Sequence, residues 1–438
     1  MVSGPRTLPR RSASLANDDP VDLAHGRRVA TLATEVAALM GFMLWEQKVL
    51  EYAALLHQIP PDQLETDSLR QAVSELASHR GDLKAGRDRS AANLAVDVAG
   101  VLKAYHRRCR QLKINEPRFA GHAEILVVCN LFVKELWPRI FERNAVKHLL
   151  DQFGWLAREG AYQEAVLKQL LALPKVQKVS LQQVIPRLPQ FPSHALRLLH
   201  PAGNRETDLT AIGVLASADK ALAGSLLGAA ARCAANPAAK ITSIRQALAV
   251  LGAPAARKVL IAAALRPVLH TEGGQELWKH SLEVAEACFQ LSQAARFPSP
   301  CEAFLAGLLH DVGRSVILRL PPEVSAAYAR FVQHGCEPLF AEVILCGFHH
   351  GEAGAEALRF WGLPEPWVEA VLNHHAPAQT SERLASLIYL AEHAIGSEEA
   401  PPDTNHLEYA LNRSGVSKGT LASLALRLGP LEALVTRT

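Results

Sequence analysis

The sequence predicts an all-α protein. Hydrophobic residues make up 49% of its 438 residues but aromatic residues only 6%, and long tracts consist of Ala and Leu, whose side chains lose little rotamer freedom in a helix. Apolar residues recur at helical spacing, and no window alternates with period two for long enough to indicate a strand. The length allows roughly two to four domains, and we expect two helical bundles.

The first bundle is predicted to span residues 21–173, after a disordered tail over residues 1–20. Its first helix runs from Asp22 to Met40, with apolar residues on one face and Gly41 as the stop. The stretch from Leu69 to Gly86 is polar and weakly patterned. The remaining helices predicted from apolar spacing are Trp45–Leu56, Ala92–Tyr105, Ala123–Leu136 and Ala161–Leu173.

A proline-rich stretch, IPRLPQFP, cannot continue a helix and places the domain boundary at residues 174–192. Short helical patterns separated by Gly, Pro and Asn follow it. The predicted helices are Ser193–Leu199, Leu209–Ala216, Lys220–Ala235, Ser243–Leu251, Ala255–Leu265, Glu276–Ala295, Cys301–Leu309, Ser325–His334, Leu339–Gly347, Ala353–Trp361, Pro366–Asn373 and Glu382–Ile395. Residues 397–438 are predicted to be a tail with one packed helix over Leu421–Leu434.

Charge, cysteine content and hydropathy exclude several classes of protein. The net charge of +3 gives no strong field for nucleic acid or anionic lipid. The seven cysteines include no C-x-x-C pair, so neither a disulfide framework nor a zinc knuckle is indicated. The basic start is not followed by an apolar segment, and the most apolar run, KVLIAAALRPVL, is shorter than the ~18–20 residues of a spanning helix. We therefore expect a cytoplasmic protein that does not enter a membrane.

Histidines form the most informative pattern. His310-Asp311 follows the apolar segment AFLAGLL, and Asp311 is the only aspartate between Asp219 and Asp403. Helical segments on either side carry further candidate ligands: His280, His349, His350, His374, His375 and Glu392. A divalent cation bound by imidazoles and carboxylates needs ligands from different helices, which a bundle brings together. The alternative is that these are capping histidines or histidines at the edge of the core.

At this point the sequence resembles a known family. The segments IPRLPQFPSHALRLL, ITSIRQALAVLGAPAARKVLI, FLAGLLHDVGR, GFHHGEAGAEALRFWGLPEPWVEAVLNHH and LIYLAEHAI follow one another in the order typical of the HD-related output domain, HDOD. HDOD is a divergent branch of the HD metal-dependent phosphohydrolase superfamily. The resemblance covers residues 181–396, about half of the chain.

The resemblance implies a ligand set. His280, His310, Asp311 and Glu392 would be metal ligands for Mg, Mn or Fe, and His350 with His374 or His375 would be extra ligands or phosphate contacts. Under the hypothesis of a phosphohydrolase, Lys279, Arg314 or Arg319 could meet the phosphate. If the domain is active, His310 and Asp311 are its catalytic residues.

The sequence departs from the pattern of the superfamily at two places that bear on catalytic activity. Glu392 stands where the superfamily has an aspartate. Arg314 follows HD-V-G and HHAPAQ follows the second His pair, whereas the cyclic-di-GMP phosphodiesterase branch has a lysine and a Gly-Tyr-Pro segment.

The N-terminal half resembles a degenerate HD domain. The step from His25 to His57 parallels the step from His280 to His310, but Gln58 and Asn130 occupy the positions of the acidic ligands. Neutral amides bring no charge to offset desolvation of a cation. This half is therefore expected to bind no metal.

The sequence therefore predicts a signalling or regulatory protein that binds a partner protein or a nucleotide, without catalysis. The second hypothesis is a metal-dependent phosphohydrolase or phosphodiesterase. A third, nucleic-acid binding through Arg107, Arg108, Arg110 and Lys113, is disfavoured because a solvated helix face explains these charges. Neither the ligand nor the oligomeric state follows from the sequence.

Overall fold

The computed structural model consists of helices, which confirms the predicted all-α class. No strand occurs among the residues that the structure describes. The described residues are 22–64, 67–80, 89–111, 115–142, 145–159, 162–173, 181–199, 205–234, 240–269, 275–297, 299–396 and 404–424. The tail predicted over residues 1–20 lies outside them, as does the last part of the predicted helix Leu421–Leu434.

The chain forms two compact units, which are described separately. Unit 1 comprises Met1–Lys178 and Pro322–Phe348, and unit 2 comprises Val179–Pro321 and His349–Thr438. The first change of unit lies within the proline-rich stretch expected at 174–192. The chain also leaves unit 2 after Pro321 and returns at His349, so the segment 322–348 belongs to unit 1 although its neighbours in sequence belong to unit 2.

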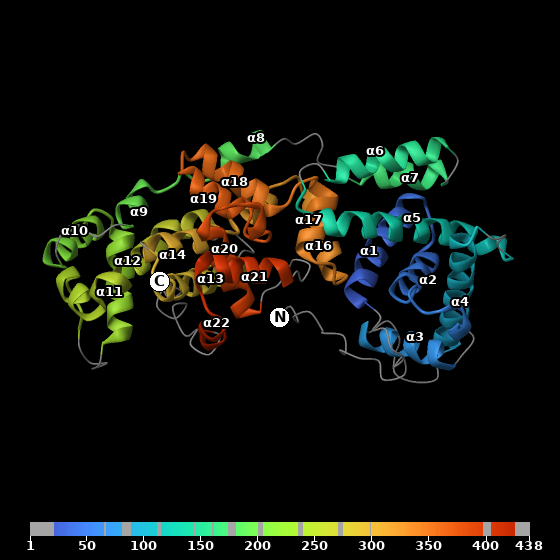
Figure 1. The fold of residues 1–438 in the computed structure, drawn as a ribbon, viewed down its shortest axis with the longest axis horizontal. Helices are drawn as coiled ribbons and strands as arrows, with labels where there is room; N and C mark the ends of the chain where they lie inside the picture. Colours follow the sequence, from blue (N-terminus) through green and yellow to red (C-terminus); the bar gives the residue numbers. More distant parts are fainter. Residues whose placement is uncertain are drawn as a thin grey trace. The chain divides into compact units, whose positions relative to one another are not determined.

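Unit 1 is built around α1, α2, α4 and α5 (Figure 1). Its helices are α1 (Leu23–Leu39), α2 (Leu44–Leu55), η1 (Pro61–Gln63), α3 (Asp67–Arg80), α4 (Arg89–Cys109), η2 (Pro117–Phe119), α5 (Ala120–Leu136), η3 (Trp137–Arg139), α6 (Ala145–Arg158), α7 (Glu164–Ala172), α16 (Pro322–Gln333) and α17 (Pro338–Cys346). Asp22 caps α1 by accepting a hydrogen bond from the backbone N–H of His25, and Gly41 follows the helix with a φ of 80°. The helices α3 and α6 were not among those predicted.

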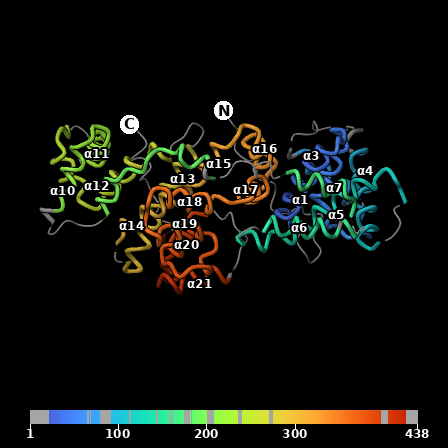
Figure 2. The backbone as a smooth tube through the Cα atoms, turned by 90° about the horizontal axis from the view of Figure 1, so that it is seen from above, coloured from blue at the N-terminus to red at the C-terminus, as the bar shows by residue number. Residues whose placement is uncertain are grey.

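The hydrophobic core of unit 2 is formed mainly by α12, α13, α14 and α20. Its helices are α8 (Leu181–Val184), η4 (Ile185–Arg187), α9 (Ser193–Arg197), α10 (Arg205–Ser217), α11 (Lys220–Cys233), α12 (Ile244–Leu269), α13 (Gln275–Ala294), α14 (Pro300–Leu309), α15 (Val312–Ile317), α18 (His350–Phe360), α19 (Glu365–Leu372), η5 (Pro377–Gln379), α20 (Arg383–Ile395), α21 (Thr404–Ser414) and α22 (Lys418–Leu424). Figure 2 shows α18, α19 and α20 following one another beside α13 and α14. This arrangement brings segments that are far apart in the sequence together in the centre of the unit.

The long helix α12 is broken by Gly252, whose backbone has a φ of 73° and a ψ of 169°. Pro254 follows in the next turn, which agrees with the two shorter helices expected here. Among the described helices, α12 is the one that is long and apolar enough to cross a membrane, and half of that apolar stretch is buried inside the protein. The run KVLIAAALRPVL, which was expected to be too short to span a membrane, is therefore part of this longer apolar helix.

Candidate metal centre

The seven predicted ligands come together in unit 2. His280 lies on α13, and His310 and Asp311 lie at the junction of α14 and α15. The others come from the first residue of α18 (His350), from the turn after α19 (His374 and His375) and from α20 (Glu392). Their ligand atoms form three overlapping groups, each compact enough to hold a metal ion. All such groups found among the described residues lie in unit 2.

The first group consists of His280, His310 and Glu392. Oε1 of Glu392 lies 2.9 Å from Nε2 of His280 and 2.9 Å from Nε2 of His310. The two Nε2 atoms are 3.2 Å apart. Two ligand atoms that lie ~2.1 Å from one ion, at right angles to each other, are about 3 Å apart. The spacing of this group therefore matches that of ligands around a single cation.

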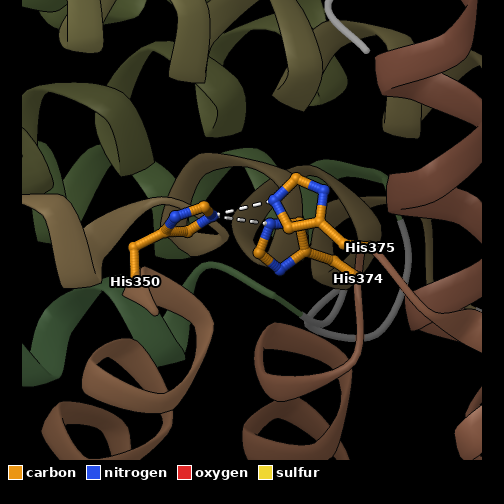
Figure 3. Close-up of side chains that lie close together, drawn as sticks. All are labelled: His350, His374 and His375. Atoms are coloured by element: carbon orange, nitrogen blue, oxygen red, sulfur yellow. Dashed lines mark hydrogen bonds between the residues drawn. The ribbon is translucent and has the colours of Figure 1, made fainter. Parts of the chain in front are cut away.

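The second group consists of His350, His374 and His375, whose rings converge on their Nε2 atoms (Figure 3). Nε2 of His350 lies 2.9 Å from Nε2 of His375 and 3.2 Å from Nε2 of His374. These side chains are buried. Three buried imidazoles that turn the same nitrogen toward one point form a ligand set that suits a transition metal.

Asp311 lies between the two groups. Its Oδ1 is 3.1 Å from Nε2 of His350 and 3.5 Å from Nε2 of His310, and its Oδ2 is 3.7 Å from Nε2 of His280. Oδ2 accepts no hydrogen bond within the described part of the chain, although Nη1 of Arg314 is 3.3 Å away. The position of Asp311 suits a carboxylate shared by two cation sites.

Backbone carbonyls fix the tautomers of two of these histidines. Nδ1 of His310 donates to the carbonyl of Gly307, and Nδ1 of His374 donates to that of Val371, each at 2.6 Å. A neutral ring held in this way presents a lone pair on Nε2. In His310 that lone pair faces the Glu392 carboxylate at 2.9 Å, and a cation between the two atoms turns this repulsion into attraction. The residues present therefore fit a divalent metal.

Burial and neighbouring charges shift the pKa values of several residues of the site. Burial alone would raise the pKa of Asp311, but the positive charge of Arg314 and the neighbouring histidines hold it well below the usual range. Burial alone would also raise the pKa of Glu392, but its interactions with His280 and His310 outweigh burial and hold this pKa well below the usual range. Burial lowers the pKa values of His374 and His375. At neutral pH the site thus offers ionised carboxylates and the neutral imidazoles of His374 and His375. Burial lowers the pKa of His280, but the hydrogen bond to Glu392 and the charges of Glu392 and Asp311 outweigh it and raise this pKa.

Two glycines allow α15, α18 and α19 to approach closely. A Cβ atom on Gly313 would lie 1.9 Å from the carbonyl oxygen of His350 and 2.6 Å from the backbone nitrogen of Gly354. A Cβ atom on Gly354 would lie 2.8 Å from Cγ1 of Val371. The backbone beside Asp311 therefore touches the backbone of His350, and this contact sets the distance between the two ligands.

We expect Gly313→Ala to destabilise unit 2 by about 1–3 kcal/mol or more, because the new methyl group meets backbone atoms that cannot rotate away. Urea unfolding followed by circular dichroism would measure the change in free energy. Gly224→Ala on α11 is the matched control, since nothing lies within 4 Å of its Cβ position and Ala is the better helix former. Equal stability of the two variants would contradict the close packing.

His349 has a different role from its neighbour His350. Its Nδ1 accepts a hydrogen bond from the backbone N–H of Gly351 at 3.1 Å, and its own N–H donates to Oε2 of Glu352 at 3.1 Å. These two bonds form a capping box at the start of α18. Burial lowers the pKa of His349 to about 3. The first histidine of the pair thus orients the helix, and the second points into the cluster.

The two predicted phosphate-binding residues lie beside metal-site residues in the chain. Arg314 is largely buried and adjoins Asp311. Lys279 is exposed and precedes His280 on α13. Their role stays a prediction. Arg319, the third candidate for this role, donates from Nη1 to the carbonyl of Ser315 at 2.7 Å.

Unit 1 contains a cluster with similar geometry, in which an amide stands in the place of the Glu392 carboxylate. The rings of His25 and His57 have centroids 5.3 Å apart, compared with 5.2 Å for His280 and His310. Nδ1 of His57 lies 2.6 Å from the carbonyl of Ala54, as Nδ1 of His310 does from that of Gly307. Asn130 takes the place of the carboxylate, accepting from Nε2 of His25 at 2.8 Å and donating to the hydroxyl of Tyr105 at 2.7 Å.

The amide at Gln58 is also engaged elsewhere, since its Oε1 accepts a hydrogen bond from the N–H of Asp22 at 2.8 Å. The parallel supports the expected degenerate HD domain, which stays a prediction.

The basic cluster near residue 107 is in part an internal ion pair, because Nε of Arg108 lies 2.7 Å from Oε2 of Glu124. Lys113 lies outside the described residues.

Comparisons with known proteins find a family match over part of the C-terminal half. Residues 188–377 match the HDOD domain family. An uncharacterized protein of Treponema pallidum (strain Nichols) is 24% identical over 213 residues, which are 48% of this chain and 42% of that protein. The chain therefore spans less than half the length of this curated relative.

Two crystal structures are also similar. One is an HDOD domain protein of unknown function from Geobacter sulfurreducens, with 23% identity over 57% of this chain and 92% of that chain and a TM-score of 0.48. The other, from Shewanella amazonensis SB2B, is named as a candidate phosphohydrolase. It has 25% identity over 59% of this chain and 96% of that chain, with a TM-score of 0.43.

The family match identifies part of the C-terminal half as a domain of a known family. More specifically, residues 188–377 of the chain are an HDOD domain. This confirms the resemblance found in the sequence for this region. The metal ligand set and the identity of the bound ion remain predictions.

Proposed function

We propose that unit 2 is a divalent-metal-dependent phosphohydrolase or phosphodiesterase. The observation that carries this proposal is the convergence of five imidazole Nε2 atoms and two ionised carboxylates, at distances typical of ligands around cations. This geometry favours the hypothesis that the sequence ranked second. A set of nitrogen and oxygen ligands suits Fe or Mn better than Mg, which prefers oxygen alone. Asp311 is placed to serve two ions.

A divalent ion bound here would polarise a phosphoryl oxygen and acidify water. The chain's own residues determine how a phosphate reaches it. The His280 and Arg314 side chains keep 20% and 17% of their surface exposed, whereas those of His310, His350 and His374 are at most 1% exposed. The open side of the centre therefore lies at His280 and Arg314. The guanidinium of Arg314 can pair with a phosphate there.

A second candidate function is regulation without turnover, in a cytoplasmic signalling protein that binds a partner protein or a nucleotide. It is favoured by Glu392 in place of the superfamily's aspartate and by the HDOD match, since HDOD domains are regarded mostly as signalling modules. In this case the metal would hold α13, α15, α18 and α20 together and would not act on a substrate.

The test is metal analysis of the purified full chain followed by removal of the metal. We expect at least one Mn or Fe per chain, and we expect chelation to lower the unfolding free energy by about 2.7 kcal/mol relative to protein in metal at 100 times its Kd. Thermal melts with and without chelator measure this change. A chain that binds neither ion and whose melting is unaffected by chelator would refute both candidate functions.

Assays with p-nitrophenyl phosphate, bis-p-nitrophenyl phosphate and a cyclic dinucleotide separate the two candidates. Metal-dependent hydrolysis of any of them supports the enzyme. Retention of metal without hydrolysis favours the regulatory module. The phosphodiester and phosphomonoester substrates also distinguish the two reaction classes.

A further inference from the structure

Two helices of unit 1 are inserted in the sequence between ligands of the candidate metal centre in unit 2. The chain leaves Asp311, runs through α15 and enters unit 1 at Pro322. It then forms α16 and α17 and returns to unit 2 at His349, immediately before His350. The segment 322–348 is thus held by one unit, while both of its ends lead to ligands in the other.

A buried ion pair attaches this segment to unit 1. Nη1 of Arg28 on α1 lies 2.7 Å from Oε1 of Glu337, the residue that caps α17. The Arg28 side chain is only 4% exposed, and its guanidinium carbon lies 3.9 Å from the ring centroid of Trp137. The same tryptophan contacts Phe340 in the first turn of α17. The start of α17 therefore has a specific polar anchor as well as an apolar one.

Further ion pairs hold α16 and the turn that follows it. Nη2 of Arg330 lies 2.8 Å from Oε1 of Glu35 on α1, and Nδ1 of His334 lies 3.2 Å from Oε1 of Glu51 on α2. Arg330 and His334 are about half exposed, so breaking these pairs costs less than removing one partner of the buried pair at Glu337, which leaves a charge buried and uncompensated. The pair between Arg28 and Glu337 is thus the main polar attachment of the segment.

The connection from α17 to the metal centre is short and well defined. Helix α17 ends at Cys346, and Gly347 follows in a left-handed conformation with a φ of 75° and donates its N–H to the carbonyl of Val343 at 3.1 Å. Only Phe348 and His349 separate Gly347 from His350. His349 is itself fixed by the capping box of α18. The covalent path from the end of α17 to His350 therefore contains only the residues Gly347, Phe348 and His349.

We propose that Arg28 and Glu337 are positioning residues for the metal ligand His350, and that unit 1 thereby sets the metal affinity of unit 2. This inference rests on the proposed function, because it concerns the same metal centre. The residues act through the covalent path from α17 to α18. Unit 1 then acts as the regulatory part of the protein, and whatever displaces α17 from α1 changes the metal centre.

The test compares variants of two ion pairs within unit 1. Arg28→Met and Glu337→Gln break the pair at α17. Arg108→Met breaks the pair with Glu124, which joins α4 to α5 at the same distance of 2.7 Å and does not involve the segment 322–348. Mn²⁺ affinity of the full chain is measured by competition with a chelating dye. Hydrogen exchange of α18 is measured on the same samples.

We expect Arg28→Met to weaken Mn²⁺ binding about 10–100-fold, the range found for groups that orient metal ligands, and to speed exchange in α18. Arg108→Met should change neither. The double variant Arg28→Met/Glu337→Gln should bind no more weakly than the weaker single variant, because both changes break one interaction. If Arg28→Met fails to fold, Glu337→Gln alone carries the comparison.

Unchanged exchange in α18 together with unchanged Mn²⁺ affinity in folded Arg28→Met would overturn the inference, as would equal effects from Arg108→Met. A wild-type chain that binds no Mn²⁺ would instead count against the proposed function. In that case faster exchange of α18 in Arg28→Met, absent in Arg108→Met, would still support the positioning role for His350. The two failures are therefore distinguishable.

Discussion

Asp311→Ala is expected to abolish metal binding and any metal-dependent hydrolysis together. Asp311 is the carboxylate that lies near both groups, with Oδ1 3.1 Å from Nε2 of His350 and Oδ2 3.7 Å from Nε2 of His280. Its loss removes the negative charge that lies near both groups. Since even partners that merely orient ligands change affinity about 10–100-fold, we expect a loss of at least about 100-fold. Metal analysis and hydrolysis assays on the folded variant measure it.

The fold must be checked separately, because Asp311 also offsets the charge of Arg314 at 3.3 Å. Asp311→Asn keeps the size of the side chain and removes only the charge, so it should lose metal with a smaller effect on unfolding. If either variant is folded, by circular dichroism, and still binds metal as the wild type does, Asp311 is not a ligand.

Histidine variants provide a matched comparison within the same chain. His310 and His57 each hold Nδ1 2.6 Å from the carbonyl of the residue three positions earlier, and both are buried. His310→Ala should therefore remove metal, whereas His57→Ala should only reduce stability. Loss of metal from both variants would indicate that unfolding, not ligand loss, is the cause.

Much of the site was predictable because its signals are local in the sequence. His310-Asp311 and the pair at His349 carry their chemistry in adjacent residues, and apolar spacing predicted most of the surrounding helices. The helix α3 was missed because its sequence, DSLRQAVSELASHR, is mostly polar. The match to the HDOD family confirms the domain that the sequence resemblance predicted, over residues 188–377.

Other features depend on packing between distant segments. The sequence does not reveal that the segment 322–348 belongs to unit 1, because its helices have the same amphipathic pattern as their neighbours. Nor does it reveal that Gly313 must lack a side chain, since its close neighbours are backbone atoms of His350 and Gly354. The buried pair between Arg28 and Glu337 joins residues that no local pattern connects.

Glu392→Gln is the second change with a large expected effect. Oε1 of Glu392 lies 2.9 Å from Nε2 of both His280 and His310. Gln has the same length and can occupy the same space, but its neutral amide cannot offset the charge of a cation. We therefore expect binding at this group to weaken about 100-fold or more, whereas the group formed by His350, His374 and His375 keeps its own three ligands.

This substitution also places an amide beside histidines in unit 2, as Asn130 lies beside His25 in unit 1. There, Asn130 accepts a hydrogen bond from Nε2 of His25 at 2.8 Å, so an amide and a histidine form a buried hydrogen-bonded pair. If Glu392→Gln retains full metal content, the cluster of His280, His310 and Glu392 is a polar contact of the same kind and not a metal site. If metal is lost while the melting temperature of the metal-free protein stays near that of the wild type, the carboxylate is present to bind a cation. Glu392→Asp, measured in parallel, then shows whether the shorter arm of the superfamily's usual residue also supports binding.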